Sequence, residues 1–256
     1  MAIVTGSGTG VGAATARQLA GLGCHVLINY SRSEQAALAV ATECQTLGVD
    51  TLVCKANVAE DAECRAMVQQ AIDKWGQVDI LVNNAGVTRF CDHARLDGLD
   101  AADFQQIYAV NVIGAYQMIR AVAAAMQTQP QGGVVVNVAS TAAITGIGSS
   151  VAYAASKGAL VTMTLSLARA LGPKLRINAV CPGFIQGDWL REGLGAEQYE
   201  AAKQHNERHA PLGVTASPET VAEAILHFII GPQIITGETL IVDGGRHLNQ
   251  VPLARR

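Results

Sequence analysis

A tyrosine, a lysine and a serine are spaced in a way that suits proton transfer to a carbonyl or from an alcohol. Tyr153 and Lys157 are four residues apart, and Ser140 precedes the tyrosine by thirteen. Positions i and i+4 share one face of a helix, so the ammonium of Lys157 can stand beside the phenol of Tyr153. A free phenol has a pKa of about 10, and a neighbouring cation favours its ionised form. We therefore expect Tyr153 to donate and accept protons with a lowered pKa, and Ser140 to bond the same substrate oxygen.

A glycine-rich run follows the first strand-like segment and opens the first predicted helix, which is the context that makes such a run informative. It comprises Thr5, Gly6, Ser7, Gly8, Thr9, Gly10, Val11 and Gly12. Gly6 permits a tight turn, and Gly10 and Gly12 let backbone and helix approach a pyrophosphate. The helix N-terminus then presents free N–H groups and a favourable dipole to the anion. The run predicts a dinucleotide site, with a plain glycine turn as the alternative.

The end of the second predicted strand bears on the choice of dinucleotide. NAD sites often carry an acid there that accepts from the ribose 2′-hydroxyl. The run here is Asn29, Tyr30, Ser31, Arg32 and Ser33, without an acid. Arg32 with Ser31 is able to bind a 2′-phosphate, which favours NADP, while NAD remains open because Arg32 also fits a solvated surface role.

Two further polar turns end the third and fourth predicted strands. The first contains Asn57 and Val58, where Asn57 suits the adenine edge, and the second contains Asn84, Ala85 and Gly86. Ligands of parallel sheets bind at the carboxyl ends of the strands. Both turns are expected to line the cofactor site, although an ordinary Asn/Gly turn is the better explanation of the second one taken alone.

Strand-like and helix-like segments alternate along the whole chain. Short Val/Ile/Leu runs predict strands at 2–5, 25–30, 51–55, 79–82, 133–138, 176–180 and 240–242, and helical periods lie between them at 34–47, 62–75, 103–127, 151–171 and 218–230, after a first helix that ends near 22. This alternation predicts an α/β fold with a single doubly wound, Rossmann-type domain over 1–256, built on a seven-stranded parallel sheet with helices on both faces. The segment 184–212 breaks the rhythm and is expected to form a substrate lid.

Composition narrows the class of protein. The chain has 256 residues, 50% of them hydrophobic and 15% charged, with a formal net charge of -3 and no basic stripe. Nucleic-acid binding is therefore not expected. No apolar run approaches the roughly 18 residues of a membrane span, and the first predicted strand leaves no room for a signal peptide. We expect a cytoplasmic protein whose six cysteines are reduced.

Taken in order, these motifs resemble the short-chain dehydrogenase/reductase family, and the resemblance covers essentially the whole chain. The matching positions are Thr5 to Gly12, Asn83 to Gly86, Asn111, Ser140, Tyr153 with Lys157, Pro182 with Gly183, and Val242 to Gly245. Within the family the chain is most similar to 3-oxoacyl-acyl-carrier-protein reductases and related ketoreductases.

The resemblance implies a role for each member of the site. Tyr153 would protonate the nascent alkoxide, Lys157 would lower its pKa and bind the nicotinamide ribose, and Ser140 would bond the carbonyl oxygen. Asn111 would hold a water that feeds protons to Lys157. Pro182, Gly183 and Ile185 would contact the cofactor, and the long helices 103–127 and 151–171 would pair subunits in a homotetramer.

The chain departs from the family pattern after Gly183. A threonine usually follows there and meets the nicotinamide carboxamide, but residues 184–189 contain none. Backbone N–H groups near Ile185 are expected to replace it. His205 and His209 have the i, i+4 spacing of zinc ligands but no third ligand is evident, so we expect no metal site. His93 is a candidate for lining the substrate pocket.

Three functions remain open from the sequence. The first is an NADPH-dependent reductase of ketones or 3-oxoacyl thioesters, and the second is an NAD-dependent alcohol, steroid or sugar dehydrogenase. The third is a sensor that binds a dinucleotide without turnover, which would tolerate loss of the tyrosine or lysine. An acidic carrier-protein partner would require a basic patch, for which Arg89, Arg95 and Lys174 are the candidates.

Overall fold

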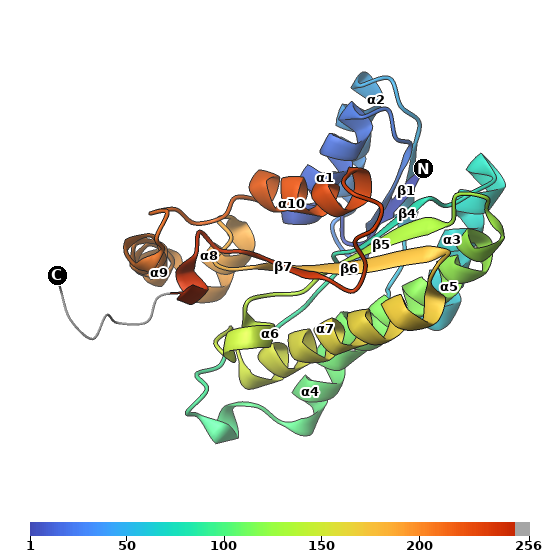
Figure 1. Cartoon of the computed structure of the whole chain (residues 1–256). Helices are drawn as coiled ribbons and strands as arrows, with labels where there is room; N and C mark the ends of the chain where they lie inside the picture. Colours follow the sequence, from blue (N-terminus) through green and yellow to red (C-terminus); the bar gives the residue numbers. More distant parts are fainter. Residues whose placement is uncertain (249–256) are drawn as a thin grey trace.

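The computed structural model describes residues 1–248, and they form a seven-stranded parallel sheet with helices on both faces (Figure 1). The strands are β1 (Ala2–Val4), β2 (Val26–Tyr30), β3 (Thr51–Lys55), β4 (Ile80–Asn83), β5 (Gly133–Val138), β6 (Leu175–Pro182) and β7 (Thr239–Val242). Their spatial order is β3-β2-β1-β4-β5-β6-β7, and all neighbouring pairs are parallel. The predicted doubly wound sheet is confirmed.

The helices divide between the two faces of the sheet. One face carries α1 (Gly10–Gly21), α2 (Glu34–Thr46) and α10 (Pro218–Ile230), and the other carries α3 (Asp61–Trp75), α4 (Ala101–Tyr108), α5 (Ala115–Thr128) and α7 (Val151–Leu171) (Figure 1). Three further helices lie towards the carboxyl ends of the strands, namely α6 (Ala142–Thr145), α8 (Asp188–Leu194) and α9 (Ala196–His209). The expected lid segment thus contains α8 and α9.

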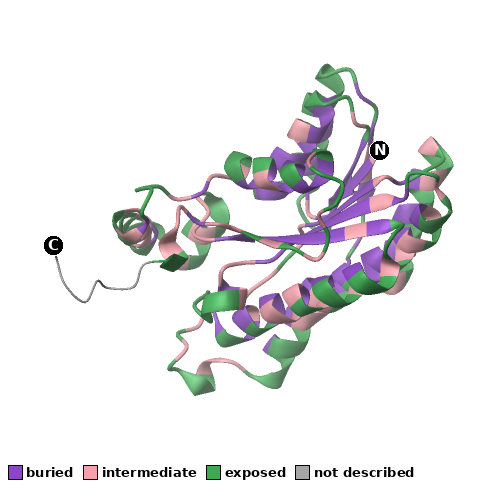
Figure 2. Cartoon of the chain, in the orientation of Figure 1, coloured by how far each residue is buried: buried purple, intermediate pink, exposed green. Residues whose placement is uncertain are grey.

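Strands β1 to β6 each contribute to two hydrophobic cores, which explains their continuous apolar sequences. In β1, Val4 packs into the core beneath α1, α2 and α10, while Ile3 packs into the core beneath α3, α5 and α7. In β2, Ile28 and Leu27 divide in the same way. Successive side chains of a strand point to opposite faces, and both faces of a parallel sheet are covered. Figure 2 shows the result as buried strands between helices with exposed outer surfaces.

The long helix predicted over 103–127 is interrupted. Between α4 and α5 the chain makes a π-helical turn over Ala109–Gly114, and Asn111 lies within it. Such one-turn widenings of a helix are frequent at functional sites. The π-helical turn packs closely against Val58, because a Cβ added to Gly114 would lie 2.8 Å from a Val58 side-chain carbon.

Capping residues fix where helices α7 and α10 begin. The Ser150 hydroxyl accepts from the Tyr153 N–H at 3.2 Å, so α7 starts with the tyrosine in its first turn. At the start of α10, Ser217 and Thr220 form a reciprocal capping box on either side of Pro218. Serine caps and an early proline are strong helix-start signals.

Two helical stretches are long and apolar enough to cross a membrane, judged by length and composition: Ala101–Thr128 and Val151–Leu171. Core helices of soluble proteins meet the same criterion. Both stretches pack on the sheet here, where Met118, Val122 and Ala168 are buried. This corrects the expectation that no apolar stretch reaches such a length.

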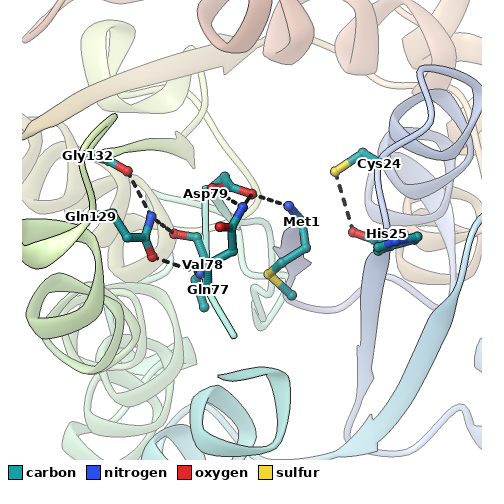
Figure 3. Close-up of polar contacts among 8 residues, drawn as sticks. All are labelled: Met1, Cys24, His25, Gln77, Val78, Asp79, Gln129 and Gly132. Atoms are coloured by element: carbon teal, nitrogen blue, oxygen red, sulfur yellow. Dashed lines mark hydrogen bonds and ion pairs between the residues drawn. The ribbon is translucent and has the colours of Figure 1, made fainter. Parts of the chain in front are cut away.

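The amino ends of the central strands are closed by polar contacts (Figure 3). The α-amino group of Met1 pairs with the carboxylate of Asp79. The Gln129 side chain accepts from the Val78 N–H and donates to the carbonyls of Val78 and Gly132, each at 3.0 Å. The polar groups at this edge therefore satisfy one another.

Candidate active site

A cavity of about 2020 Å³ lies at the opposite edge, where loops from the carboxyl ends of all the strands converge. The sheet order reverses between β1 and β4, and ligands of doubly wound folds bind at this position. Most of the predicted site residues line it: Gly6, Gly8, Thr9, Gly10, Val11, Tyr30, Ser31, Arg32, Asn57, Val58, Asn84, Ala85, Gly86, Ser140, Tyr153, Lys157, Pro182, Gly183 and Ile185. Three predicted site residues, Ser7, Gly12 and Asn111, lie behind its wall.

Ser7 and Gly12 shape the glycine turn from beneath. The buried Ser7 hydroxyl donates to the Val4 carbonyl at 2.7 Å and accepts from the Asn29 N–H at 3.0 Å. A Cβ on Gly12 would lie 2.5 Å from the Gly6 carbonyl oxygen, so only glycine allows the helix to approach the turn. Both residues therefore support the glycine turn, and their expected contact with the cofactor stays a prediction.

The start of α1 fits an anionic group. Gly10 has a φ of 54° and opens the helix at the cavity wall. No side chain caps α1, and its first turn contains no acid. The helix dipole and the N–H groups of the first turn are therefore available to a pyrophosphate. The residues present fit a dinucleotide cofactor.

Two asparagines brace the glycine turn against the neighbouring strands. The Asn29 side chain accepts from the Gly6 N–H at 3.0 Å and donates to the Ala56 carbonyl at 3.0 Å. Asn84 donates to the carbonyls of Thr5 and Gly6 at 2.9 and 3.0 Å. The sequence placed Asn84 in the site but missed Asn29, whose only signal was a polar residue within an apolar strand.

The end of β2 leaves a cation open to the cavity. Ser31 and Arg32 are exposed and line it, and Arg32 has no ion pair among residues 1–248. Glu34, the acid nearest to Arg32 in the sequence, accepts a hydrogen bond from the Tyr30 hydroxyl at 2.8 Å. Arg32 and Ser31 thus provide donors where the adenosine ribose of a dinucleotide is expected.

Asn57 is partly committed to its own turn. Its side-chain oxygen accepts from the Ala59 N–H at 3.1 Å, and its backbone N–H donates to Glu63 at 2.7 Å. The side-chain amide nitrogen is left as the group able to meet an adenine edge. The predicted contact therefore narrows to a hydrogen bond donated by Asn57.

Tyr153, Lys157 and Ser140 come together as the spacing predicts. Ser140 lies beside the phenol of Tyr153, where its hydroxyl lowers the pKa of the phenol, and both side chains line the cavity. The ammonium of Lys157 lies 5.6 Å from the centroid of the Tyr153 ring. It is buried and donates to the Val138 carbonyl at 2.7 Å.

The protonation state of the phenol differs from the expectation. Burial raises the pKa of Tyr153 to about 12, although the hydrogen bond with Ser140 acts in the opposite direction. Burial likewise lowers the pKa of Lys157 to about 8. The predicted lowering of the tyrosine pKa by Lys157 is thus wrong for this arrangement, because loss of solvation outweighs a cation that bonds a backbone carbonyl instead. At neutral pH the phenol is a proton donor.

The side chain of Asn111 is linked to the site by hydrogen bonds to the backbone of the loop after β4. Its side chain accepts from the Val87 N–H at 2.8 Å and donates to the Val87 carbonyl and the Ser156 hydroxyl, each at 3.0 Å. A Cβ on Gly86 would lie 3.5 Å from its side-chain oxygen and 3.6 Å from the Lys157 nitrogen. Asn111 therefore ties the loop after β4 to α7 beside the lysine, and its expected role with water stays a prediction.

The loop after β6 offers a backbone donor in place of the missing threonine. The N–H of Ala216 donates to the Phe184 carbonyl at 3.1 Å, and the Ala216 carbonyl accepts from the Gln186 N–H at 2.8 Å. The N–H of Ile185 has no acceptor within the described part of the chain, and Ile185 lines the cavity. This agrees with a backbone contact to a carboxamide at Ile185.

The family model described as enoyl-(acyl carrier protein) reductase matches residues 6–247. The chain belongs to the short-chain dehydrogenase/reductase family. It is an NAD(P)-dependent oxidoreductase, so a sensor without turnover is not supported.

Several relatives of this short-chain dehydrogenase/reductase match over nearly the whole chain. Ketoacyl reductase 2, named for the granaticin polyketide synthase of Streptomyces violaceoruber, is 38% identical over 97% of this chain and 96% of its own length. A 3-oxoacyl-[acyl-carrier-protein] reductase of Synechocystis is 35% identical, with 96% of each chain covered. A solved structure from Burkholderia xenovorans, assigned to the same family, has a TM-score of 0.89 at 36% identity and covers 97% of this chain and 98% of its own.

Aromatic side chains wall the cavity beside the tyrosine of this dehydrogenase/reductase. The Trp189 ring lies 5.8 Å from that of Phe90 and 6.1 Å from that of Tyr153, centroid to centroid. Gly193 of α8 packs directly on Phe90, since an added Cβ would come within 2.0 Å of the ring. Phe90 was not among the predicted site residues, and nothing local to its sequence signalled this contact.

The remaining candidates take minor places. His93 lines the cavity, and its Nε2 lies 3.1 Å from the Gly148 carbonyl oxygen. The rings of His205 and His209 are 4.2 Å apart, but no group of three or more potential metal ligands occurs within residues 1–248. Cys181 is fully buried, and burial raises the pKa of its thiol to about 11, which disfavours reactivity.

Proposed function

We propose that this protein reduces ketones with NADPH, with 3-oxoacyl thioesters among its substrates. The observation that carries the proposal is the Tyr153 phenol, which burial keeps protonated and which lies beside Ser140 on the wall of the cavity. A phenol with a pKa of about 12 is protonated at neutral pH. It is also a stronger acid than the product alcohol, so it can protonate the alkoxide that forms during reduction. The arrangement therefore favours reduction over oxidation near neutrality.

The chain's own groups divide the work of the reaction. Nicotinamide, when bound, supplies the hydride. Ser140 donates a hydrogen bond to the substrate oxygen, and Tyr153 transfers its proton to that oxygen as negative charge develops. Lys157 is placed to bind ribose hydroxyls, with its ammonium steadied by Val138. Phe90 and Trp189 give this part of the cavity an aromatic wall against which the substrate can pack.

Arg32 and Ser31 support NADP over NAD. A guanidinium binds phosphate oxygens through several hydrogen bonds, and Glu34, the acid nearest in sequence, is engaged by Tyr30. The alternative has support among relatives. An L-rhamnose 1-dehydrogenase (NAD(P)(+)) of a Sphingomonas species is 34% identical over 96% of each chain. The solved structure of NAD+-bound xylitol dehydrogenase has a TM-score of 0.88 at 25% identity, with 95% of this chain and 97% of that chain covered.

The basic groups considered for a carrier-protein partner do not form one patch. Arg89 and Arg95 line the cavity, whereas Lys174 donates to the Gln129 carbonyl at the amino edge of the sheet. A thioester substrate is therefore supported by the ketoacyl reductase relatives more than by surface charge.

The cofactor proposal is tested with Arg32→Ala. We expect kcat/KM for NADPH to fall by about tenfold, with NADH turnover almost unchanged, because only NADPH carries the 2′-phosphate. Arg65→Ala is the control, since Arg65 pairs with Asp61 outside the cavity. Equal kcat/KM for NADPH and NADH in the parent protein, or an unchanged kcat/KM for NADPH in the variant, would contradict the proposal.

The substrate proposal is tested with a carbonyl panel and NADPH. The panel contains an acetoacetyl thioester, a small diketone, a cyclic ketone and an aldose lactone, while the aldose itself is assayed with NADP+ and NAD+ because its oxidation consumes the oxidised cofactor. Turnover of the ketones supports a reductase. Turnover confined to the sugar pair would favour the dehydrogenase alternative.

We also propose a homotetramer. Exposed apolar side chains lie along the outer surfaces of α4, the π-helical turn, α5 and α7: Phe104, Ile113, Tyr116, Val151 and Leu165. Helices with two apolar faces commonly bury the second one against another subunit. Light scattering that finds only a 26.7 kDa particle would refute this assembly.

A further inference from the structure

Arg246 opens a short turn that follows β7 at the carboxyl edge of the sheet. Its N–H donates to the Asp243 carbonyl at 3.1 Å, and Asp243 packs against Gly183, where an added Cβ would come within 2.6 Å of the aspartate Cβ. Gly183 belongs to the loop after β6, which is hydrogen-bonded to the loop that carries Ser140. Arg246 lines the same cavity as Ser140 and Tyr153.

Within residues 1–248, no group compensates the charge of Arg246. Among residues 1–248 it has no ion pair, and its buried Nε has no hydrogen-bond acceptor. The nearest acid along the chain, Asp243, is fully engaged by other groups. It accepts from the N–H groups of Gly245 and His247 at 2.9 and 2.8 Å and lies 2.9 Å from the His247 Nδ1. A buried cationic donor without an acceptor is costly, so an anion that enters the cavity gains by meeting it.

The positive charge of Arg246 reaches α9. Burial lowers the pKa of His205 on α9, and the charges of His209, Arg246 and Arg208 lower it further. α9 also contributes the neutral side chain of Asn206 to the cavity wall. Arg246 therefore lies close enough to α9 for its charge to act on groups of that helix.

Three acids must be considered on the facing elements. Asp188 and Glu192 of α8 line the cavity, but neither forms an ion pair with Arg246. Glu207 of α9 lies 3.9 Å from Lys203. None of them supplies the missing acceptor of Arg246 in this structure.

We propose that Arg246 binds an anionic group of the substrate, a carboxylate or a phosphate, while the ketone of the same molecule meets Tyr153 and Ser140. The inference rests on the proposed ketone reduction and adds a substrate class to it. A guanidinium presents a fork of donors that matches both kinds of anion. The anion has two sources: the carboxylate of a small keto acid, or the phosphate of a phosphopantetheine thioester.

Two matched pairs of ketones separate these sources. The first pair is a keto acid and its methyl ester, and the second is S-acetoacetyl phosphopantetheine and S-acetoacetyl pantetheine. In the parent protein we expect the charged member of one pair to be preferred in kcat/KM by roughly tenfold to hundredfold. Arg246→Gln should abolish that preference through KM and leave the neutral members unchanged. Arg246→Lys should retain part of it.

Arg191→Gln is the matched control, because Arg191 lies on α8, pairs with Glu200 and does not line the cavity. It should leave both pairs unaffected. The inference is overturned if neither charged substrate is preferred, if Arg246→Gln weakens charged and neutral members equally, or if it raises the KM for NADPH instead. Absence of turnover for all four ketones in the parent protein would instead refute the proposed function.

Discussion

The two edges of the sheet use polar residues in opposite ways. At the amino edge, Gln129 makes three hydrogen bonds to backbone groups and Met1 pairs with Asp79, so the ends of the central strands are sealed. At the carboxyl edge, the side chains of Tyr153 and Arg246 face a cavity of about 2020 Å³ with few protein partners. Both edges are built from the same strands and the same kind of loops.

The difference shows which polar groups serve stability and which serve chemistry. A polar group with all its partners in the protein lowers the free energy of the fold and has nothing left to offer a ligand. A buried group that lacks partners, or whose pKa is shifted by burial, costs stability and gains from a ligand. Substitutions at the two edges should therefore change different measurements, and the following variants test that division.

Tyr153→Phe should have the largest effect. It removes the proton donor but keeps the ring, so we expect turnover to fall by about a hundredfold to ten-thousandfold with little change in cofactor Kd. Steady-state kinetics and a fluorescence titration with NADPH measure the two quantities. Tyr108→Phe, on α4 and outside the cavity lining, is the control. Turnover near the parent rate would remove Tyr153 from the mechanism.

Lys157→Met should change how stability depends on pH. The folded-state pKa of Lys157 is about 8 and its ordinary value is 10.5, so the unfolded chain binds more protons between these values. The unfolding free energy contributed by this group therefore rises with pH across that window, by about 3 kcal/mol in total. The burial cost is fully present below pH 8. Replacement by methionine should remove the rise.

Denaturant unfolding of parent and variant from pH 7 to 11 measures the difference directly. Lys174→Met, at the amino edge, should leave the pH dependence as it is because that lysine is exposed. A parent-minus-variant difference that stays flat with pH would show that Lys157 is not destabilised by burial. Loss of activity is expected in Lys157→Met and not in Lys174→Met.

Gln129→Ala should have the smallest effect and a purely structural one. It leaves the buried Val78 N–H without its acceptor, so we expect a loss of about 1–3 kcal/mol in unfolding free energy. The KM and kcat of the reductase should not change. Gln127→Ala, exposed on the same helix, is the control. A shift in KM would mean that the two edges are coupled.

Much of the site followed from local sequence because its residues occupy the turns that end strands or share one face of α7. The glycine turn, Asn84, Ser140 and the pair Tyr153 and Lys157 are fixed by spacing, and the strands place them at one edge. Phe90 and Arg246 could not be predicted in this way. Their places depend on how the loops after β4 and β7 pack against α8 and the loop after β6, which no sequence period records.

Alternating apolar strands and helices, together with the order of polar turns, determined the doubly wound sheet and the membership of its reactive edge, because periodicity and spacing are local properties of a chain. Tertiary packing decided the charge states at that edge. Solvation depends on every atom that surrounds a group, so the protonated phenol of Tyr153, the lowered pKa of Lys157 and the uncompensated Arg246 emerged only once the loops were brought together.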